Sequence, residues 1–250
     1  AVLQHDLNAD SNVYASFSEG FKAGGYATYE CTEPYDPEEV TSFELGFKGS
    51  LGENTSLNAS LFRYDYTDFQ VLQVVGIQTV TRNAGDATVN GLELEALSNI
   101  NDSLSINYGL TLLDATYGEF LNTNGIQPQL GEQQLEGNYL TNAPKVSINL
   151  GLNYTSLMSS GSSLTYRANA AYKSRIYFSE FNEYSQDAYT IVDLNLIWES
   201  SDETLRSRFF IKNATDEEYI SGYLSSATGG GRFGQWGYPR TAGIEIQRNF

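Results

Sequence analysis

The chain has 250 residues and a formal net charge of −17 at pH 7, which argues against nucleic-acid binding because contact with phosphates needs a basic face. Its single cysteine excludes an internal disulfide framework. The sequence contains no run of about 18 apolar residues of the kind that a transmembrane helix requires.

Apolar and polar residues alternate with a period of two through most of the chain, which predicts an all-β protein. Frequent Tyr, Phe and Gly with rare Pro also favour strands and turns. After Leu61 the apolar phase shifts, which we interpret as a bulge or as a crossing of the membrane boundary. About ten strands are predicted, at 12–22, 40–51, 55–75, 79–98, 103–118, 141–157, 163–179, 188–199, 204–213 and 239–250.

The predicted connections between these strands fall into two length classes. Short turns are expected at 51–54, 99–102, 158–161 and 200–203. Long loops are expected at 23–39, 119–140, 180–187 and 214–238, with a brief connection near 76–78. Short periplasmic turns and long extracellular loops are typical of outer-membrane β-barrels.

The two ends of the chain also fit this interpretation. The last strand alternates through Ile244 and Ile246 and stops on Phe250, and we expect these three residues to act as the barrel-closing signal. The segment 1–6 lacks the basic start and apolar centre of a signal peptide, so we expect a mature or cut N-terminus.

Alternation alone also fits a soluble β-sandwich, in which the apolar residues face inward. Three features favour a transmembrane barrel instead. The strands are longer than the roughly five or six residues usual in a sandwich. The polar faces are rich in Gly, Ser, Thr and Asn, and Tyr and Phe gather near strand ends, as in the aromatic girdles of membrane barrels.

Seven stretches resemble, in order, the C-terminal barrel of TonB-dependent outer-membrane receptors. They are YASFSEGFK at 14–22, FELGFK at 43–48, FRYDYTDFQ at 62–70, NAGDA at 83–87 with GLELE at 91–95, APK at 143–145, KNATDEEY at 212–219 and PRTAG at 239–243. Each motif is weak by itself, and the ordered set over nearly the whole chain carries the resemblance.

The resemblance implies that residues 1–250 are the C-terminal segment of a barrel of about 22 strands. The plug domain and the other strands would lie outside these residues, in the same precursor or in another chain. It also implies a non-enzymatic importer in the outer membrane of a Gram-negative bacterium, without a cofactor, in contact with lipid and driven by the TonB complex through the plug. A ferric siderophore is the default substrate, while heme, cobalamin, oligosaccharides and other organic compounds stay open. A soluble sandwich binding module and a small passive porin are the alternatives.

Two groups of residues are candidates for ligand contact. Aromatic side chains on loops or rims can stack on a ligand and gate it. They are Tyr35, Tyr177, Tyr184, Tyr223, Phe233 and Trp236. Cationic side chains expected to line the lumen either form a route for an anionic ferric chelate or pair with acidic residues of a plug. They are Arg167, Lys173, Arg175, Arg206 and Arg208.

Other motifs favour structural interpretations. The G-x-G-x-x-G pattern at 229–234 lacks the preceding strand and following helix of a dinucleotide site, so we expect a loop. His5 is the only histidine and predicts no metal site or serine triad. Cys31 is either a free thiol or half of a disulfide with a partner outside these residues. The acidic residues in 36–39 and 216–218 are either solvated loop charges or calcium ligands.

Overall fold

The computed structural model describes residues 1–27, 30–75, 78–226 and 231–249, and it is almost entirely β-structure. Within these ranges a single short 3₁₀ turn, η1 (Pro128–Leu130), interrupts the strands and loops. None of the helices in the described part of the chain has the length and apolarity needed to cross a membrane.

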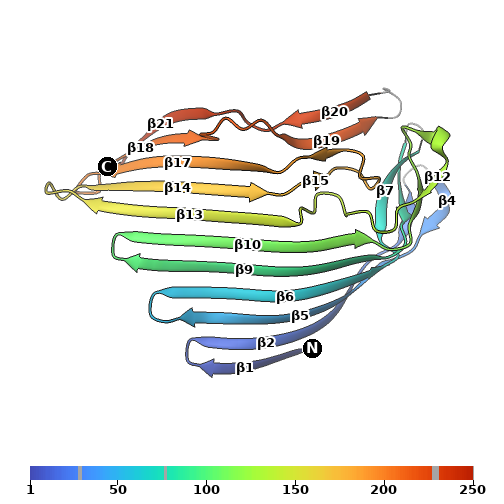
Figure 1. Ribbon diagram of the computed structural model, residues 1–250, viewed down its shortest axis with the longest axis horizontal. Coiled ribbons are helices and arrows are strands. Elements are labelled where there is room, and N and C mark those ends of the chain that lie inside the picture. The colour runs from blue at the N-terminus through green and yellow to red at the C-terminus, as the bar shows by residue number, and fades with distance from the viewer. Residues whose placement is uncertain (28–29, 76–77, 227–230, 250) are drawn as a thin grey trace.

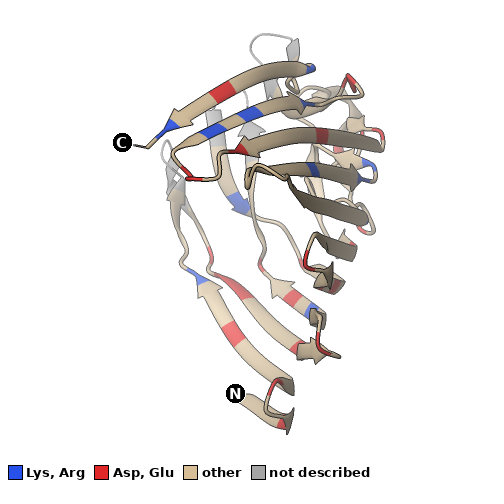
Figure 2. Ribbon diagram, turned by 90° about the vertical axis from the view of Figure 1, so that its left-hand side faces the viewer, with Lys and Arg blue, Asp and Glu red and all other residues tan. Residues whose placement is uncertain are grey.

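Eleven strands form one antiparallel sheet, and their order across the sheet follows their order along the chain (Figure 1). Figure 2 shows this sheet as a curved wall. The strands are β1 (Val2–Asn8), β2 (Ser11–Lys22), β5 (Glu38–Leu51), β6 (Thr55–Thr67), β9 (Ala87–Asn101), β10 (Leu104–Tyr117), β13 (Val146–Leu157), β14 (Ser163–Lys173), β17 (Tyr189–Glu199), β18 (Leu205–Lys212) and β21 (Thr241–Arg248).

The other strands form small hairpins inside the connections at one end of the sheet, while short turns join the wall strands at the other end (Figure 1). The hairpin strands are β3 (Gly25–Ala27) with β4 (Glu30–Tyr35), β7 (Gln70–Val75) with β8 (Gln78–Asn83), β11 (Leu121–Thr123) with β12 (Glu132–Gln134), β15 (Ile176–Tyr177) with β16 (Ser185–Gln186), and β19 (Ile220–Ser226) with β20 (Gly231–Trp236). The predicted separation of short turns from long loops is confirmed.

The structure corrects three details of the predicted strands. A first strand, β1, precedes the ten that were predicted. The strands expected at 55–75, 79–98 and 163–179 each break near the loop end, so 68–86 and 174–188 are connections. The brief connection expected near 76–78 falls partly outside the described residues. The bulge expected after Leu61 is wrong, because β6 pairs with both neighbours without a register shift.

The two faces of the sheet differ in chemistry along every strand pair. Leu45, Leu61 and Leu92 are direct partners across β5, β6 and β9, and they are 53%, 56% and 37% exposed. Their sequence neighbours Ser60 and Glu93 are paired on the opposite face. Since side chains alternate across a strand, one face of the wall is apolar and exposed, and the other is polar. The phase change at Leu61 puts large rings, beginning with Phe62, on the polar face near the loops.

On the polar face, large side chains lie over glycines of the neighbouring strand. At Gly91, an added Cβ would come within 2.1 Å of the Phe62 ring, which belongs to its direct partner on β6. The same arrangement joins Tyr14 to Gly46 and Phe210 to Gly243. The glycines therefore give the rings room to lie flat against the wall.

The loop end of the sheet has a small hydrophobic core of its own. Ala84, Tyr117, Phe120 and Leu135 are buried there against one another. Partly buried apolar residues of three connections surround them, namely Phe69, Val71, Leu140 and Phe181. The described parts of the connections 68–86, 118–145 and 174–188 therefore fold together as one compact layer, named the loop layer below.

Candidate functional site

The polar face of the wall is divided by charge. Glu44, Glu93 and Glu95 lie on this face of β5 and β9, with Lys48 as a cation among them. The Tyr14 hydroxyl donates a hydrogen bond to Glu44, and Lys48 Nζ lies 5.1 Å from the centre of the Tyr14 ring. A polar cavity of about 270 Å³ opens among these side chains. This half of the wall offers an acidic surface.

The strands β10 and β13 separate this acidic region from a basic one. Their paired residues on the polar face are uncharged Ser, Asn, Gly and Thr. Beyond them the cations begin at Arg167 on β14 and continue with Arg206 and Arg208 on β18. Carboxylates of β17 and β21 lie among these cations, namely Asp193, Glu199 and Glu245. Figure 2 marks several Lys and Arg positions in blue along the strands nearer the C-terminus, with acidic positions in red among them.

The five predicted lumen cations occupy different positions. Arg208 donates to Asn195 Oδ1 at 2.9 Å and pairs with Glu245 at 3.2 Å. Lys173 is the last residue of β14 and lies opposite Ser147 and Tyr189. By contrast, Arg175 lies beyond the end of β14, where it forms an exposed ion pair with Asp187 at 2.7 Å. It therefore belongs to the loop layer rather than to the sheet.

Polar side chains join the connection between β2 and β5 to the connection 68–86. The Gln70 amide donates to the carbonyl oxygens of Ala23 and Asp36, both at 3.1 Å. The backbone N–H of Gln70 donates to Glu38 Oε2 at 2.7 Å. Asn83 exchanges hydrogen bonds with the backbone of Asp36 at 2.7 and 3.0 Å. Of the acidic residues predicted in 36–39, Glu38 is thus used through its carboxylate, whereas Asp36 takes part through its backbone.

Asparagines join the connections 118–145 and 174–188 in a similar way. Asn182 accepts a hydrogen bond from the Tyr139 N–H at 2.7 Å and donates to the Tyr139 carbonyl at 2.9 Å. The Asn138 amide donates to the Glu180 carbonyl at 2.9 Å. Asn182 has a positive φ of 53°, a conformation that asparagine tolerates better than most residues. The loop layer is therefore fixed by specific side-chain bonds as well as by its core.

Two of the six predicted aromatic contacts come together where the loop layer meets β19. The rings of Tyr184 and Tyr223 are stacked, with centroids 5.0 Å apart and planes at 15°. Phe178 stacks on the same Tyr223 ring at 6.1 Å and 14°. Three aromatic side chains from two connections thus form one stacked column.

The other four predicted aromatics lie elsewhere. Tyr177 stacks on Tyr139 at 5.7 Å, and the Tyr35 ring covers Gly25 in its own hairpin. Phe233 and Trp236 are on β20, where they are 59% and 66% exposed. These two side chains are available for contact from solution.

A small pocket of about 90 Å³ adjoins the aromatic column. The Asn122 amide donates to Glu180 Oε1 and the Asn124 amide donates to Glu183 Oε1, both at 3.1 Å. Burial raises the pKa of the Glu180 carboxyl above its usual value, and the neighbouring Glu183 raises it further. The pocket is lined by Leu72, Asn122, Thr123, Asn124, Gly125, Ile126, Ser179, Glu180, Phe181, Glu183, Tyr184 and Tyr223.

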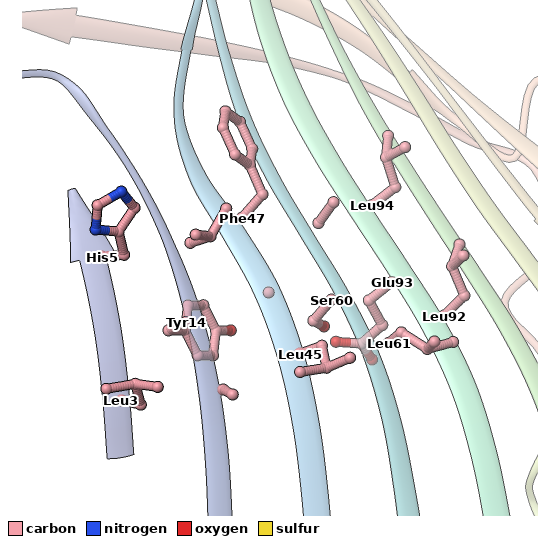
Figure 3. Close-up of a pocket in the computed structure, with 14 residues that line it drawn as sticks. Leu3, His5, Tyr14, Leu45, Phe47, Ser60, Leu61, Leu92, Glu93 and Leu94 are labelled. Carbon is pink, nitrogen blue, oxygen red and sulfur yellow. The ribbon is translucent and has the colours of Figure 1, made fainter. Parts of the chain in front are cut away.

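A larger cavity, of about 510 Å³, lies on the apolar face across β1 to β9. Figure 3 shows Leu3, Leu45, Leu61 and Leu92 side by side along its wall, with His5 above Leu3 on β1. A broad exposed apolar surface of this kind is what a wall in contact with lipid presents. We therefore assign this cavity to the hydrocarbon-facing surface rather than to ligand chemistry.

Some sequence predictions concern parts that the structure does not describe. Phe250, the glycines of 229–230 and the side chain of Cys31 lie outside the described residues. Ile244 and Ile246 lie on the apolar face, 72% and 70% exposed. In the described ranges, no group of three or more His, Cys, Asp or Glu side chains is arranged to hold a metal ion.

Sequence reasoning missed the polar residues that build the loop layer, above all Asn122, Asn124, Asn182, Glu180 and Glu183. Asn and Glu are common in exposed loops, so their identity gives no sign of which ones meet. The distances between these residues depend on how two connections fold against each other.

Comparison with known proteins gives a consistent result. A family model described as TonB dependent receptor-like, beta-barrel matches residues 1–214. A probable TonB-dependent siderophore receptor of Acinetobacter baumannii is 29% identical over 191 residues, which are 74% of this chain and 24% of that protein. The ferric-pyoverdine BN7/BN8 receptor of Pseudomonas putida is 23% identical over 100% of this chain and 28% of its own length.

Among solved structures, the ferric yersiniabactin uptake receptor FyuA of Yersinia pestis matches with a TM-score of 0.82 and 21% identity. This match covers 100% of the chain and 36% of that receptor chain. The chain thus spans between about a quarter and about a third of the length of these proteins.

Proposed function

Because this chain belongs to the β-barrel family of TonB-dependent receptors, proteins of the Gram-negative outer membrane, we propose that it forms barrel wall and extracellular loops of an active importer. The family consists of transport receptors, and we propose transport without catalysis. The cargo is a scarce nutrient, with a ferric siderophore or similar iron complex as the first choice. The named substrates of the relatives support that choice.

The observation that carries the proposal is the two-faced wall. Its apolar face is exposed across β1 to β21, and its polar face carries small polar residues and charges. A wall with lipid on one side and an aqueous or protein-filled lumen on the other requires this distribution. The loop layer then lies at the extracellular end, where cargo arrives.

We propose that the 250 residues are the C-terminal segment of a larger barrel. Within the described residues, β1 pairs only with β2 and β21 pairs only with β18. Unpaired strand edges are prohibitively costly in lipid, so further strands must pair with both. We assign those strands, and a plug that fills the lumen and contacts the TonB complex, to the rest of the same precursor or to a second chain.

The polar face gives the plug a surface with two signs of charge. The acidic region around Glu93 and Glu95 suits basic plug residues, and the basic region around Arg167 and Arg206 suits acidic ones. At the loop end of the sheet, Tyr184 and Tyr223 are the favoured ligand contacts, and exposed Phe233 and Trp236 would capture cargo from solution.

The test is uptake of radiolabelled iron by the producing bacterium. Under iron limitation, deletion of the gene that encodes this chain should abolish uptake of at least one ferric chelate. A plasmid copy should restore the uptake, and a protonophore should stop it. Unchanged uptake across a panel of ferric siderophores would contradict iron transport. Uptake that survives the protonophore would favour a passive porin instead.

A gel experiment tests the membrane placement separately. In native outer-membrane material, the folded receptor should migrate differently before and after boiling in SDS. A protein that shows no heat shift and no membrane association would favour a soluble sandwich.

A further inference from the structure

The side chains that line the pocket beside the aromatic column favour a positively charged ligand. Glu180 and Glu183 are its ionisable carboxylates, and none of its described lining residues is a lysine, an arginine or a histidine. A carboxylate accepts up to about four hydrogen bonds, so the bonds from Asn122 to Glu180 and from Asn124 to Glu183 leave further acceptor capacity. The pocket can therefore receive a hydrogen-bond donor that carries positive charge.

The aromatic side of the pocket favours the same kind of group. Tyr184 and Tyr223 line the pocket, and because Tyr223 stacks on both Tyr184 and Phe178, the Tyr184 ring stands at the end of the column. Aromatic faces attract ammonium groups through their electron-rich centres, and they repel anions for the same reason. Tyrosine rings and carboxylates next to one another are thus a combination suited to a cation.

Ser179 gives an independent sign that the pocket is built for a ligand. Ser179 lines the pocket, and its hydroxyl oxygen is buried without a hydrogen-bond partner in the described part of the chain. Buried polar atoms normally have partners, because an unsatisfied one costs about 1–3 kcal/mol. A rotation of the Ser179 side chain towards the pocket would let a ligand N–H satisfy this oxygen.

The pocket is also held in place before any ligand arrives. Asn182 joins the Tyr139 backbone to the Ser179 carbonyl, with its amide donating to the latter at 3.2 Å. The Asn124 side chain accepts from the Ile126 N–H at 3.0 Å. A rigid site loses little conformational entropy on binding. Its electrostatic preference for a cation should therefore appear as a higher affinity for a charged ligand than for its neutral form.

From these contacts we infer that the loop pocket is a subsite for a protonated primary amine on the transported chelate. The inference rests on the proposed function and narrows its substrate class. The cargo is a ferric chelate whose periphery carries an ammonium group, in contrast to anionic catecholate or carboxylate chelates. The volume of about 90 Å³ admits an alkylammonium end but not an iron centre, so the metal stays outside the pocket.

The test uses two ferric complexes that differ only in charge. One is the iron(III) complex of a linear trihydroxamate with a free terminal amine, and the other is the same complex with the amine acetylated. An iron(III) tris-catecholate, which is anionic, is the third probe. Affinities for the intact receptor in detergent are measured by quenching of tryptophan fluorescence.

The free amine should bind about tenfold more tightly than the acetylated form, in line with the strength of a partly desolvated cation–aromatic and ion-pair contact. Glu183→Gln should reduce that ratio to near one. Glu183 is exposed, so this change should leave folding intact. The matched control is Glu136→Gln, which removes the same charge from an exposed position of the 118–145 connection outside the pocket and should keep the ratio.

Equal affinity for the amine and its acetylated form would overturn the amine subsite while leaving iron uptake in place. Tighter binding of the tris-catecholate would overturn it as well. Failure of all three probes to bind would contradict both the subsite and the ferric chelate as cargo.

Discussion

The contact between Phe62 and Gly91 can be tested by adding one methyl group. Gly91 on β9 lies opposite Phe62 on β6, and a Cβ there would approach three ring carbons to 2.1, 2.5 and 2.7 Å. Phe62 is 7% exposed and stacks on Tyr64 with centroids 4.8 Å apart. Gly91→Ala therefore forces a packed ring to move.

The size of the effect follows from the packing. Overpacking of this kind costs about 1–3 kcal/mol, and we expect about 2 kcal/mol for Gly91→Ala alone. Phe62→Ala alone should cost about 3 kcal/mol. In the Phe62→Ala background, the alanine at 91 has free space and should be neutral or stabilising by up to about 1 kcal/mol, because glycine is a poor strand residue. The coupling free energy is therefore about 2–3 kcal/mol, well above the roughly 0.5 kcal/mol scatter of independent sites.

The assay is urea unfolding of the intact receptor in phospholipid vesicles, followed by fluorescence, for the two single variants and the double variant. The control is Gly109→Ala on the same face of β10, where the added Cβ would meet Asn149 at an ordinary 3.6 Å. It should change the free energy of unfolding by less than about 0.5 kcal/mol. If Gly91→Ala behaves like Gly109→Ala, or if the costs of the double variant simply add, the ring-over-glycine explanation fails.

Three further predictions concern the loop layer and the lipid face. Asn182→Ala should destabilise the folded 174–188 connection by about 2–3 kcal/mol, since it removes three hydrogen bonds and strains a φ of 53°. Protease cleavage of this connection on whole cells should accelerate, and an unchanged cleavage rate would contradict the stabilising role of Asn182. Because burial raises the pKa of Glu180, the stability of this connection should be greatest below the ordinary value of 4.5 and fall as pH rises through the raised pKa. Hydrogen exchange at 176–186 should show that trend, and Glu180→Gln should flatten it. Ile244→Arg on the apolar face should cost about 2–4 kcal/mol in a bilayer, whereas Gln247→Arg on the polar face should be tolerated; equal costs in refolding titrations would reject the assignment of the two faces.

The wall was predictable because each of its strands carries its own pattern. In Leu92-Glu93-Leu94-Glu95 the alternation places the leucines on the apolar face and the glutamates on the polar face, as the pairing with β6 confirms. The strand β1 escaped prediction because His5 interrupts the apolar positions of Leu3 and Leu7. Period-two patterning is a local property, so it predicts strands and faces without any knowledge of distant contacts.

The ends of the strands and the pocket were less accessible to sequence reasoning. Val71 and Leu72 are as strand-prone as the wall residues before them, and only the positive φ of 53° at Asp68 marks where β6 ends. The pocket requires Asn122 and Asn124 to meet Glu180 and Glu183 from another connection. No periodicity encodes such a meeting, which depends on how the two loops pack.

The shared core of the loop layer has a consequence for antibodies and for protein engineering. A synthetic peptide that copies only residues 118–145 would lack the side chains of Phe69, Val71 and Phe181 that surround its buried residues in the fold. Antibodies raised against it would therefore recognise shapes that the native surface does not present. For the same reason, exchanging one of these loops with that of a relative would leave the other two without partners. The three segments form a single conformational epitope and are best transplanted as one cassette.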